Sequence, residues 1–84
     1  GPSSIVEQEG ALPVLAWPNP VHDMLTVDGG QWIRAEVIDA QGKVVERLQV
    51  KAGALDLSSI ATGSYTLVLT DRQGLTGALR IEKQ

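Results

Sequence analysis

The sequence predicts an all-β fold, a small antiparallel β-sandwich of about seven strands. Apolar residues alternate with polar ones almost throughout the chain, and the i, i+3, i+4 spacing of an amphipathic helix is absent. Turn-forming residues recur at intervals of about 8–12 residues, which is typical of short strands in a sandwich. A chain of 84 residues has room for one such domain, with a thin core.

Composition excludes several classes of function. The chain has no cysteine and one histidine, so disulfides, cysteine-based zinc sites, thiol nucleophiles and sites with two histidine ligands are excluded. The formal net charge is −3 and the seven lysines and arginines are scattered, so we expect no nucleic-acid partner. No apolar run approaches the roughly 18 residues of a membrane-spanning helix, so we expect no membrane insertion.

The first ten residues differ from the rest of the chain. Gly1-Pro2 is typical of the remnant that a protease leaves when it removes a tag, and residues 3–10 are mostly small or polar. We therefore interpret residues 1–10 as a remnant and a linker, and residues 11–84 as the folded domain.

The first half of the domain predicts an edge strand, a corner and two further strands. Residues 12–17 are apolar but contain one proline and precede another, which suits a sheet edge because proline cannot donate to a ladder. Residues 17–20 form an extended corner, because residues before proline avoid the helical region. Residues 24–28 and 32–39 alternate as strands, with the Asp28-Gly29-Gly30 turn between them.

A hairpin follows. Asp39 and Gly42 bound its turn, in which Gly42 can take a positive φ. Residues 43–50 are the partner strand, and Val45 lies on the wrong face for regular alternation, which predicts a bulge.

The second half ends with two longer strands. Residues 58–61 form a tight turn, and the carboxylate of Asp56 accepts the amide of one of the serines after it. Residues 64–70 are the clearest strand, and residues 75–82 close the chain. The predicted core consists of Leu15, Leu25, Val27, Ile33, Val37, Leu48, Ile60, Tyr65, Leu67, Leu69, Leu79 and Ile81.

No residue pattern indicates catalysis. His22 and Asp23 are the one pair of neighbouring histidine and carboxylate, and adjacent strand residues point to opposite faces. The aspartates of four separate turns are too dispersed for a calcium site, and we interpret them as turn formers and caps: Asp28, Asp39, Asp56 and Asp71. We therefore expect no enzyme activity, no catalytic residue, no metal and no cofactor.

The two tryptophans leave two interpretations open. If both rings are exposed on one face, they would form an aromatic platform for sugars. If they are packed, Trp17 would anchor the proline-rich corner and Trp32 would close one end of a sheet. We favour packing.

Four segments resemble, in order, the motifs of the C-terminal sorting domain of the type IX secretion system of Bacteroidota, the Por secretion sorting domain of type A. The segments are residues 17–27 (its YPNP…D.L.V opening), 37–45 (V.D..GK.V), 55–65 (LDLS.L..G.Y) and 79–84 (a basic-tipped last strand). The resemblance covers residues 12–84. Trp17 and Ile38 stand where the family commonly has tyrosine.

The resemblance implies an immunoglobulin-like β-sandwich of about seven strands that acts as a non-catalytic secretion signal. The parent protein passes through the periplasm, and the type IX translocon recognises the domain and moves the parent across the outer membrane. A sortase-like cysteine protease then cleaves before the domain and attaches the parent to anionic lipopolysaccharide at the cell surface. A homodimer is also open, because a sandwich leaves unpaired strand edges.

The same resemblance implies roles for two groups of residues. Translocon recognition is assigned to Pro18, Asn19, Pro20, Gly63, Tyr65, Arg80, Lys83 and Gln84. Structural roles are assigned to Asp39, Gly42, Asp56 and Leu57. We expect Lys83 to face solvent, and Tyr65 to bury its ring while its hydroxyl finds a partner. Recognition through a backbone edge is also open.

Two alternatives remain. A retained sorting-type domain would serve as a docking or lipopolysaccharide-carrying module in the secretion machinery. A carbohydrate-binding or adhesive sandwich would need Trp17, Trp32 or Tyr65 exposed on one face.

Overall fold

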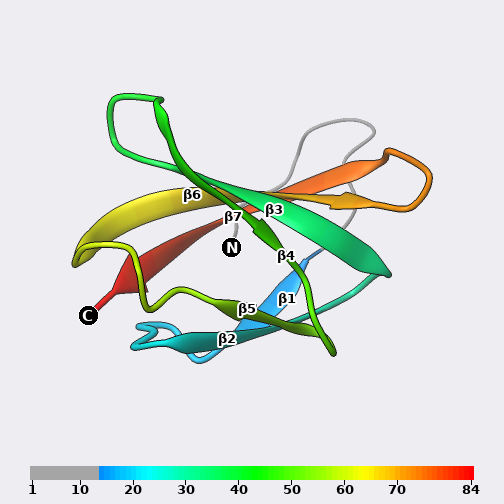
Figure 1. Ribbon diagram of the computed structural model, residues 1–84, viewed down its shortest axis with the longest axis horizontal. Coiled ribbons are helices and arrows are strands. Elements are labelled where there is room, and N and C mark those ends of the chain that lie inside the picture. Colours follow the sequence, from blue (N-terminus) through cyan, green and yellow to red (C-terminus); the bar gives the residue numbers. More distant parts are fainter. Residues whose placement is uncertain (1–13) are drawn as a thin grey trace.

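A computed structural model describes residues 14–84. The predicted remnant and linker of residues 1–10, and the start of the predicted strand 12–17, lie outside the described residues. The described residues form seven strands in two antiparallel sheets that pack face to face, without a helix (Figure 1). The predicted all-β sandwich is confirmed.

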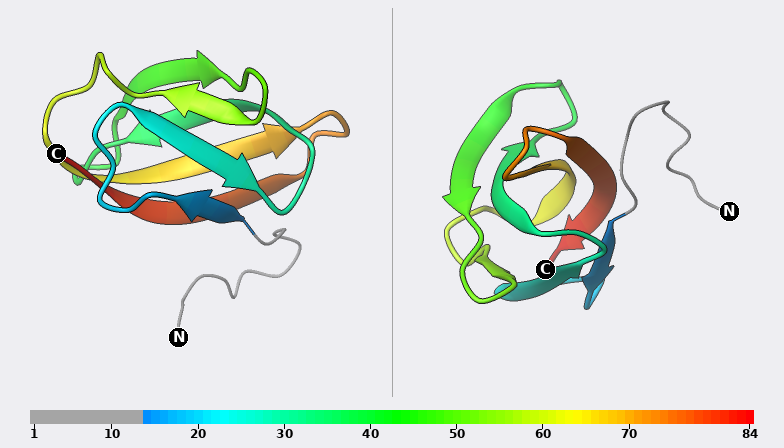
Figure 2. Two further views of the ribbon diagram at one scale, coloured as in Figure 1. Left: turned by 90° about the horizontal axis from the view of Figure 1, so that it is seen from below. Right: turned by 90° about the vertical axis from the view of Figure 1, so that its right-hand side faces the viewer.

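The smaller sheet has the strand order β1-β2-β5 and the larger sheet the order β4-β3-β6-β7 (Figures 1 and 2). The strands are β1 (Leu15–Trp17), β2 (Met24–Asp28), β3 (Trp32–Ile38), β4 (Val44–Gln49), β5 (Ala54–Asp56), β6 (Gly63–Asp71) and β7 (Thr76–Lys83). The predicted strands agree with these bounds to within a few residues. The exception is β5, for which no strand was predicted.

Register shifts decide which side chains of β3 and β4 reach the core. Opposite β4, Val37 pairs with Glu46 and Ile38 pairs with Val44. Val45 is therefore the extra residue of the predicted bulge, which is confirmed. A second shift lies between β3 and β6, at Trp32.

This second shift places Trp32 in the core together with Ala35, whereas Ile33 is only half-buried. The indole Nε1 of Trp32 donates to the backbone oxygen of Asp28 at 3.0 Å. Trp32 thus packs as favoured, and the prediction that Ile33 belongs to the core is wrong.

The core between the sheets is mainly aliphatic. Its buried members are Val21, Leu25, Val27, Trp32, Ala35, Val37, Leu55, Leu57, Ile60, Leu67, Leu69 and Ile81. Leu48, Tyr65 and Leu79 pack against them, half-buried. Seven of the twelve core residues predicted from the sequence are thus buried, and these three lie beside them.

Strand β1 presents the opposite face from the one expected. Ala16 pairs with the buried Val27 and faces the core, so its neighbours point outward. Leu15 is 56% exposed and Trp17 is 50% exposed. The prediction that Leu15 belongs to the core is wrong, and the favoured packing of Trp17 is not observed.

Aspartate side chains organise the turns locally, as predicted. Oδ1 of Asp39 accepts the amides of Gln41 and Lys43, both at 2.9 Å, and Gly42 has a φ of 86°. Asp71 makes the same pair of bonds in the β6–β7 turn, where Gly74 has a φ of 89°. Left-handed backbone of this kind favours glycine.

Asp56 caps the turn after β5. Its Oδ1 accepts the Ser58 hydroxyl at 2.6 Å and the Ser58 amide at 3.0 Å, which confirms the predicted Asx-type cap. These bonds, the hydroxyl bond first, hold the pKa of the Asp56 carboxyl below its ordinary value of 3.8.

The two tryptophans provide a matched test of the core. Trp32→Phe removes the indole bond to Asp28 and leaves space in the core, and it should lower the free energy of unfolding by about 1–3 kcal/mol. Trp17→Phe makes the same chemical change on the surface and should cost less than about 0.5 kcal/mol. Urea denaturation measures both, and equal effects would contradict the described placement of the two rings.

The Asp56 cap should produce a pH-dependent contribution to stability. Because the pKa of Asp56 is lowered in the folded state, its stabilisation is complete above the ordinary value of 3.8 and is lost as pH falls through the folded pKa. Ser58→Ala should therefore be less stable than the unmodified chain at pH 7, and the gap should shrink below pH 3.8. Urea denaturation across this range tests it, with Ser59→Ala as the control. A gap independent of pH would count against the cap.

Candidate functional site

One end of the sandwich brings together segments from opposite ends of the chain. The corner, defined here as residues 18–23 between β1 and β2, lies beside the end of β7 and the start of β6 (Figure 2, left). Val21 bridges to Lys83 in parallel, and Lys83 pairs on its other side with Gly63. The corner therefore continues the larger sheet past the edge of β7.

The side chain of Asn19 acts as a peptide group along this edge. Its Oδ1 accepts the amide of Glu82 at 2.9 Å, and its Nδ2 donates to the backbone oxygen of Arg80 at 3.3 Å. These bonds join residues more than 60 positions apart in the sequence. Pro18 and Pro20 have no backbone N–H to donate. The side chain of Asn19 therefore supplies the hydrogen bonds to this part of the β7 edge.

Val21 continues the pairing that Asn19 begins. Its amide donates to the Glu82 oxygen at 2.8 Å, and its oxygen accepts the Gln84 amide at 2.8 Å. Its side chain is fully buried in the core. The corner is thus held by backbone bonds on one side and by apolar packing on the other. Val21 and Glu82 were missed by the sequence analysis.

Lys83 points inward. It is 7% exposed, and its Nζ donates to the backbone oxygen of Gln84 at 3.4 Å. The expectation that Lys83 faces solvent is wrong, because β7 alternates with Ile81 and Lys83 inside and Arg80 and Glu82 outside. The apolar stem of a lysine can be buried while its amine reaches a polar partner.

Tyr65 lies at the start of β6 and supports the same end of the sandwich. Its ring is half-buried, and its hydroxyl donates to the Ala61 oxygen at 2.7 Å, as expected. The ring lies against Gly63, where a Cβ would come within 3.7 Å of it. Tyr65 pairs with Ile81 across β6 and β7.

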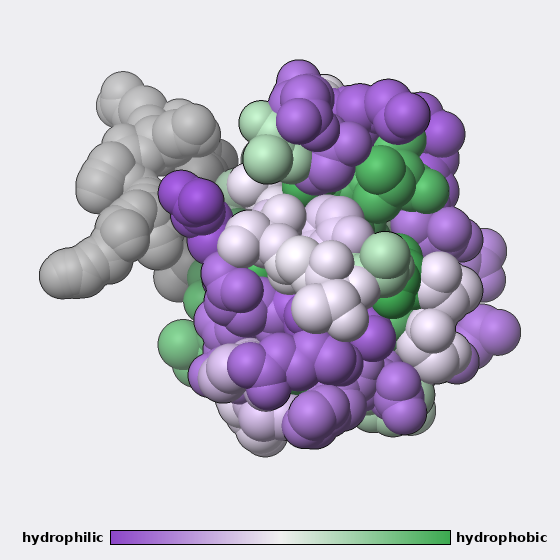
Figure 3. Space-filling model, turned by 90° about the vertical axis from the view of Figure 1, so that its left-hand side faces the viewer, coloured by the Kyte–Doolittle hydropathy of each residue, from purple (hydrophilic) through white to green (hydrophobic). Residues whose placement is uncertain are grey.

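The residues assigned to recognition therefore gather in one region. The corner residues Pro18, Asn19 and Pro20 are exposed, as are Arg80 and Gln84, whereas Lys83 is buried. Seen from this end, the surface is mainly hydrophilic around an area of intermediate hydropathy (Figure 3).

The residues assigned to structure serve the turns and the core. Asp39 and Gly42 make their bonds within the β3–β4 hairpin. Leu57 is fully buried, and its amide donates to the Asp23 oxygen at 2.7 Å, which ties the loop after β5 to the corner.

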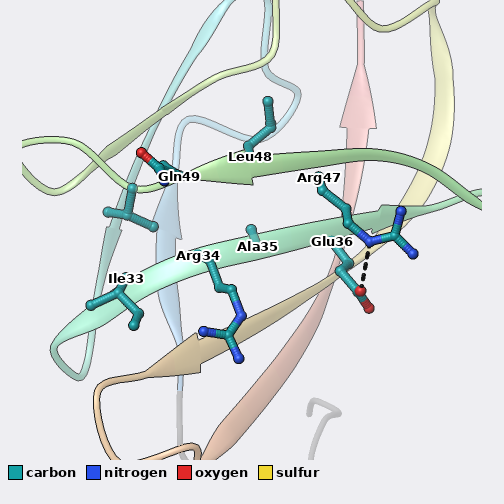
Figure 4. A pocket seen from close by; sticks show the side chains of 8 residues that line it. Ile33, Arg34, Ala35, Glu36, Arg47, Leu48 and Gln49 are labelled. Atoms are coloured by element: carbon teal, nitrogen blue, oxygen red, sulfur yellow. Dashed lines mark hydrogen bonds and ion pairs between the residues drawn. The ribbon is translucent and has the colours of Figure 1, made fainter.

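The outer surface of β3 and β4 carries a shallow hollow (Figure 4). Arg47 Nε lies 3.2 Å from Glu36 Oε2 within it, and both side chains are exposed, so the pair contributes little to stability. The hollow contains no nucleophile with an adjacent base. Within residues 14–84, no three histidine or acidic side chains are grouped to hold a metal ion.

An aromatic platform for sugars is not assembled by the described residues. Trp17 is half-exposed, Trp32 is buried, and the hydroxyl of Tyr65 is engaged within the chain. No helix long and apolar enough to cross a membrane occurs in residues 14–84.

Asn19 offers a direct test of the corner. Asn19→Ala removes both bonds to β7, so it should lower the free energy of unfolding by about 1–2 kcal/mol and speed hydrogen exchange at the Glu82 amide. Asn19→Asp keeps an acceptor for that amide, so it should preserve more of the protection. Exchange measured by NMR distinguishes the variants, and His22→Ala in the same corner is the control. Unchanged Glu82 exchange in Asn19→Ala would refute the described pairing.

Comparison with known proteins identifies the family. No curated protein and no solved structure matches the chain. The family described as the secretion system C-terminal sorting domain matches residues 15–81, which is well over half of the chain. The match covers nearly all the residues in which the motif resemblance was found, and this resemblance is confirmed. The chain therefore belongs to the secretion system C-terminal sorting domain family, whose members carry the type IX sorting signal.

Proposed function

We propose that this chain directs the protein that carries it across the outer membrane through the type IX translocon, which recognises the corner together with the end of β7. The observation that carries the proposal is the pairing of Asn19 and Val21 with the backbone of β7. This pairing joins the segments that resemble the first and the last motif of the family.

This arrangement supports recognition of the folded domain. Residues 18–20 and Arg80 are far apart in an unfolded chain and adjacent only in the sandwich. A translocon that contacts both therefore reads the tertiary structure. In the proposed route the parent protein passes through the periplasm and reaches the outer membrane and cell surface.

Processing at the cell surface is a further part of the proposal. A sortase-like cysteine protease cleaves before the domain, and the parent is joined to anionic lipopolysaccharide. The predicted linker of residues 3–10 is the segment in which such a cut is expected. The domain itself acts without catalysis, in keeping with a family that is non-catalytic in general.

A reporter experiment tests the route. The chain is fused behind a periplasmic reporter in a secretion-competent Bacteroidota host, and surface exposure and reporter size are scored. We expect a surface reporter that has lost the domain and migrates as a heavy glycolipid smear. Arg80→Ala, which changes an exposed recognition residue, should reduce delivery at least severalfold. Arg34→Ala on β3 removes the same charge elsewhere and is the control.

Other outcomes would identify the alternatives. A surface reporter that keeps the whole domain would favour a retained docking module over a cleaved signal. A reporter that stays in the periplasm with the domain intact would contradict the proposed function and favour a carbohydrate-binding or adhesive role, which glycan binding at the half-exposed Trp17 would then support.

A further inference from the structure

The strand edges of this sandwich are not equally protected. In the smaller sheet, β1 and β5 have three residues each, and Pro18 follows β1 directly. In the larger sheet, β4 carries the bulge at Val45 and the charged Glu46 and Arg47. Short length, proline, bulges and charges are the features that keep edges from pairing with other chains. Three of the four edges therefore have such protection.

The fourth edge belongs to β7, an eight-residue strand whose register with β6 runs without a shift from Gly63↔Lys83 to Thr70↔Thr76. The bonds to the corner show which backbone groups point away from β6, because Glu82 and Gln84 donate outward. Alternation along the strand then directs the amides and oxygens of Thr76 and Ala78 outward as well.

This stretch remains open within the described part of the chain. Asn19 and Val21 occupy the edge from the Arg80 oxygen to Gln84, and no strand of residues 14–84 pairs with the edge before it. We call the outward backbone groups of Thr76 and Ala78, with the amide of Arg80, the open edge.

The side chains along the open edge leave it accessible. Residues 76–78 are threonine, glycine and alanine, with neither a charge nor a proline among them. Gly77 has no side chain to obstruct an incoming backbone, and Thr76 and Ala78 on either side of it are exposed. The stretch spans about 13 Å to Arg80, enough for a short strand to pair.

Charge at the end of the open edge favours one kind of partner. Arg80 is exposed, and the ion pair found within residues 14–84 joins two other residues, Arg47 and Glu36. A carboxylate on the incoming strand would therefore lie beside a guanidinium that no acidic side chain of residues 14–84 pairs with.

A second copy of this chain fits the open edge less well. An antiparallel pairing that uses both Thr76 and Ala78 would align the β6–β7 turn of one copy with residues 80–82 of the other. The side chain of Asn19 already lies against those residues. The corner thus opposes extended pairing between two β7 strands.

We propose that the open edge of β7 accepts an extended segment of a partner protein as a fifth strand of the larger sheet, with an acidic side chain of that segment beside Arg80. This inference rests on the proposed function, in which the translocon supplies the partner, and it specifies the mode of recognition. Main-chain bonds give such a complex its affinity, and alternate side chains give it specificity.

Binding is tested first with the purified chain and a synthetic probe, a short peptide of alternating threonine and valine with glutamate at each end. Hydrogen exchange at the amides of Thr76, Ala78 and Arg80 should slow by about tenfold or more on adding the peptide. The same peptide with alternate amides N-methylated should give no protection. A version with lysine in place of glutamate should bind more weakly. Failure of the unmethylated peptide to protect these amides would overturn the proposal.

The chain's own N-terminal segment provides another decisive outcome. If the Ala78 amide is already protected in the chain alone and loses protection when residues 1–13 are removed, the edge belongs to that segment and the proposal is wrong. An edge that exchanges rapidly both with and without residues 1–13 supports it.

The secretion assay separates this inference from the proposed function. Ala78→Pro removes one outward amide and leaves the pairing with β6 intact, so it should fold and reduce surface delivery by about tenfold. Ala78→Val keeps the amide and should be delivered normally.

Normal delivery of folded Ala78→Pro would overturn edge pairing while leaving the sorting function in place. Failure of the unmodified reporter to leave the periplasm would overturn the sorting function, and the peptide experiment would still decide the edge. If Ala78→Pro does not fold, Ala78→Lys, which adds a charge to the edge, takes its place.

Discussion

Hydrogen bonds from the corner to β7 hold together segments from the two ends of the described chain. Two prolines prevent residues 18–20 from forming an ordinary strand, yet the edge beside them needs partners for its backbone groups. The amide side chain of Asn19 meets this need because it carries a donor and an acceptor in the geometry of a peptide group. Once the corner is held there, Val21 enters the core, and the chain can cross from one sheet to the other.

The same contact determines what the C-terminal end of the domain presents. With Glu82 and Gln84 bonded outward to the corner, the side chains of Ile81 and Lys83 must face the core, while Arg80 and Glu82 face solvent. The surface near the last strand therefore combines an exposed arginine with the backbone of the corner. The side chain of Lys83 is buried, so the outer surface at this end of β7 is formed by Arg80 and Glu82.

Under the proposed function, a sorting signal built in this way depends on folding. Each motif of the family is short, and in this chain two of them meet through a few hydrogen bonds between residues from opposite ends of the sequence. The turns that hold the strands in order are local and use aspartate, with glycine where the backbone requires a positive φ. Local turns and one long-range contact together define the end of the domain that we propose the translocon recognises.

The fold class, most of the strands, the aspartate turns and the bulge at Val45 could be predicted from the sequence, because period-two alternation and turn chemistry are local properties. The family could be predicted too, because its motifs are short stretches of sequence. Tertiary structure alone decided which face of β1 is buried, since three residues carry too little pattern to fix their orientation before they pair with β2. It also decided that Trp32 replaces Ile33 in the core, because a register shift reverses the expected face. Lys83 points inward by the regular alternation that buries Ile81, although a charged residue near the end of the chain is expected to face solvent. The partner of Asn19 lies more than 60 residues away, and no local pattern encodes a contact at that separation.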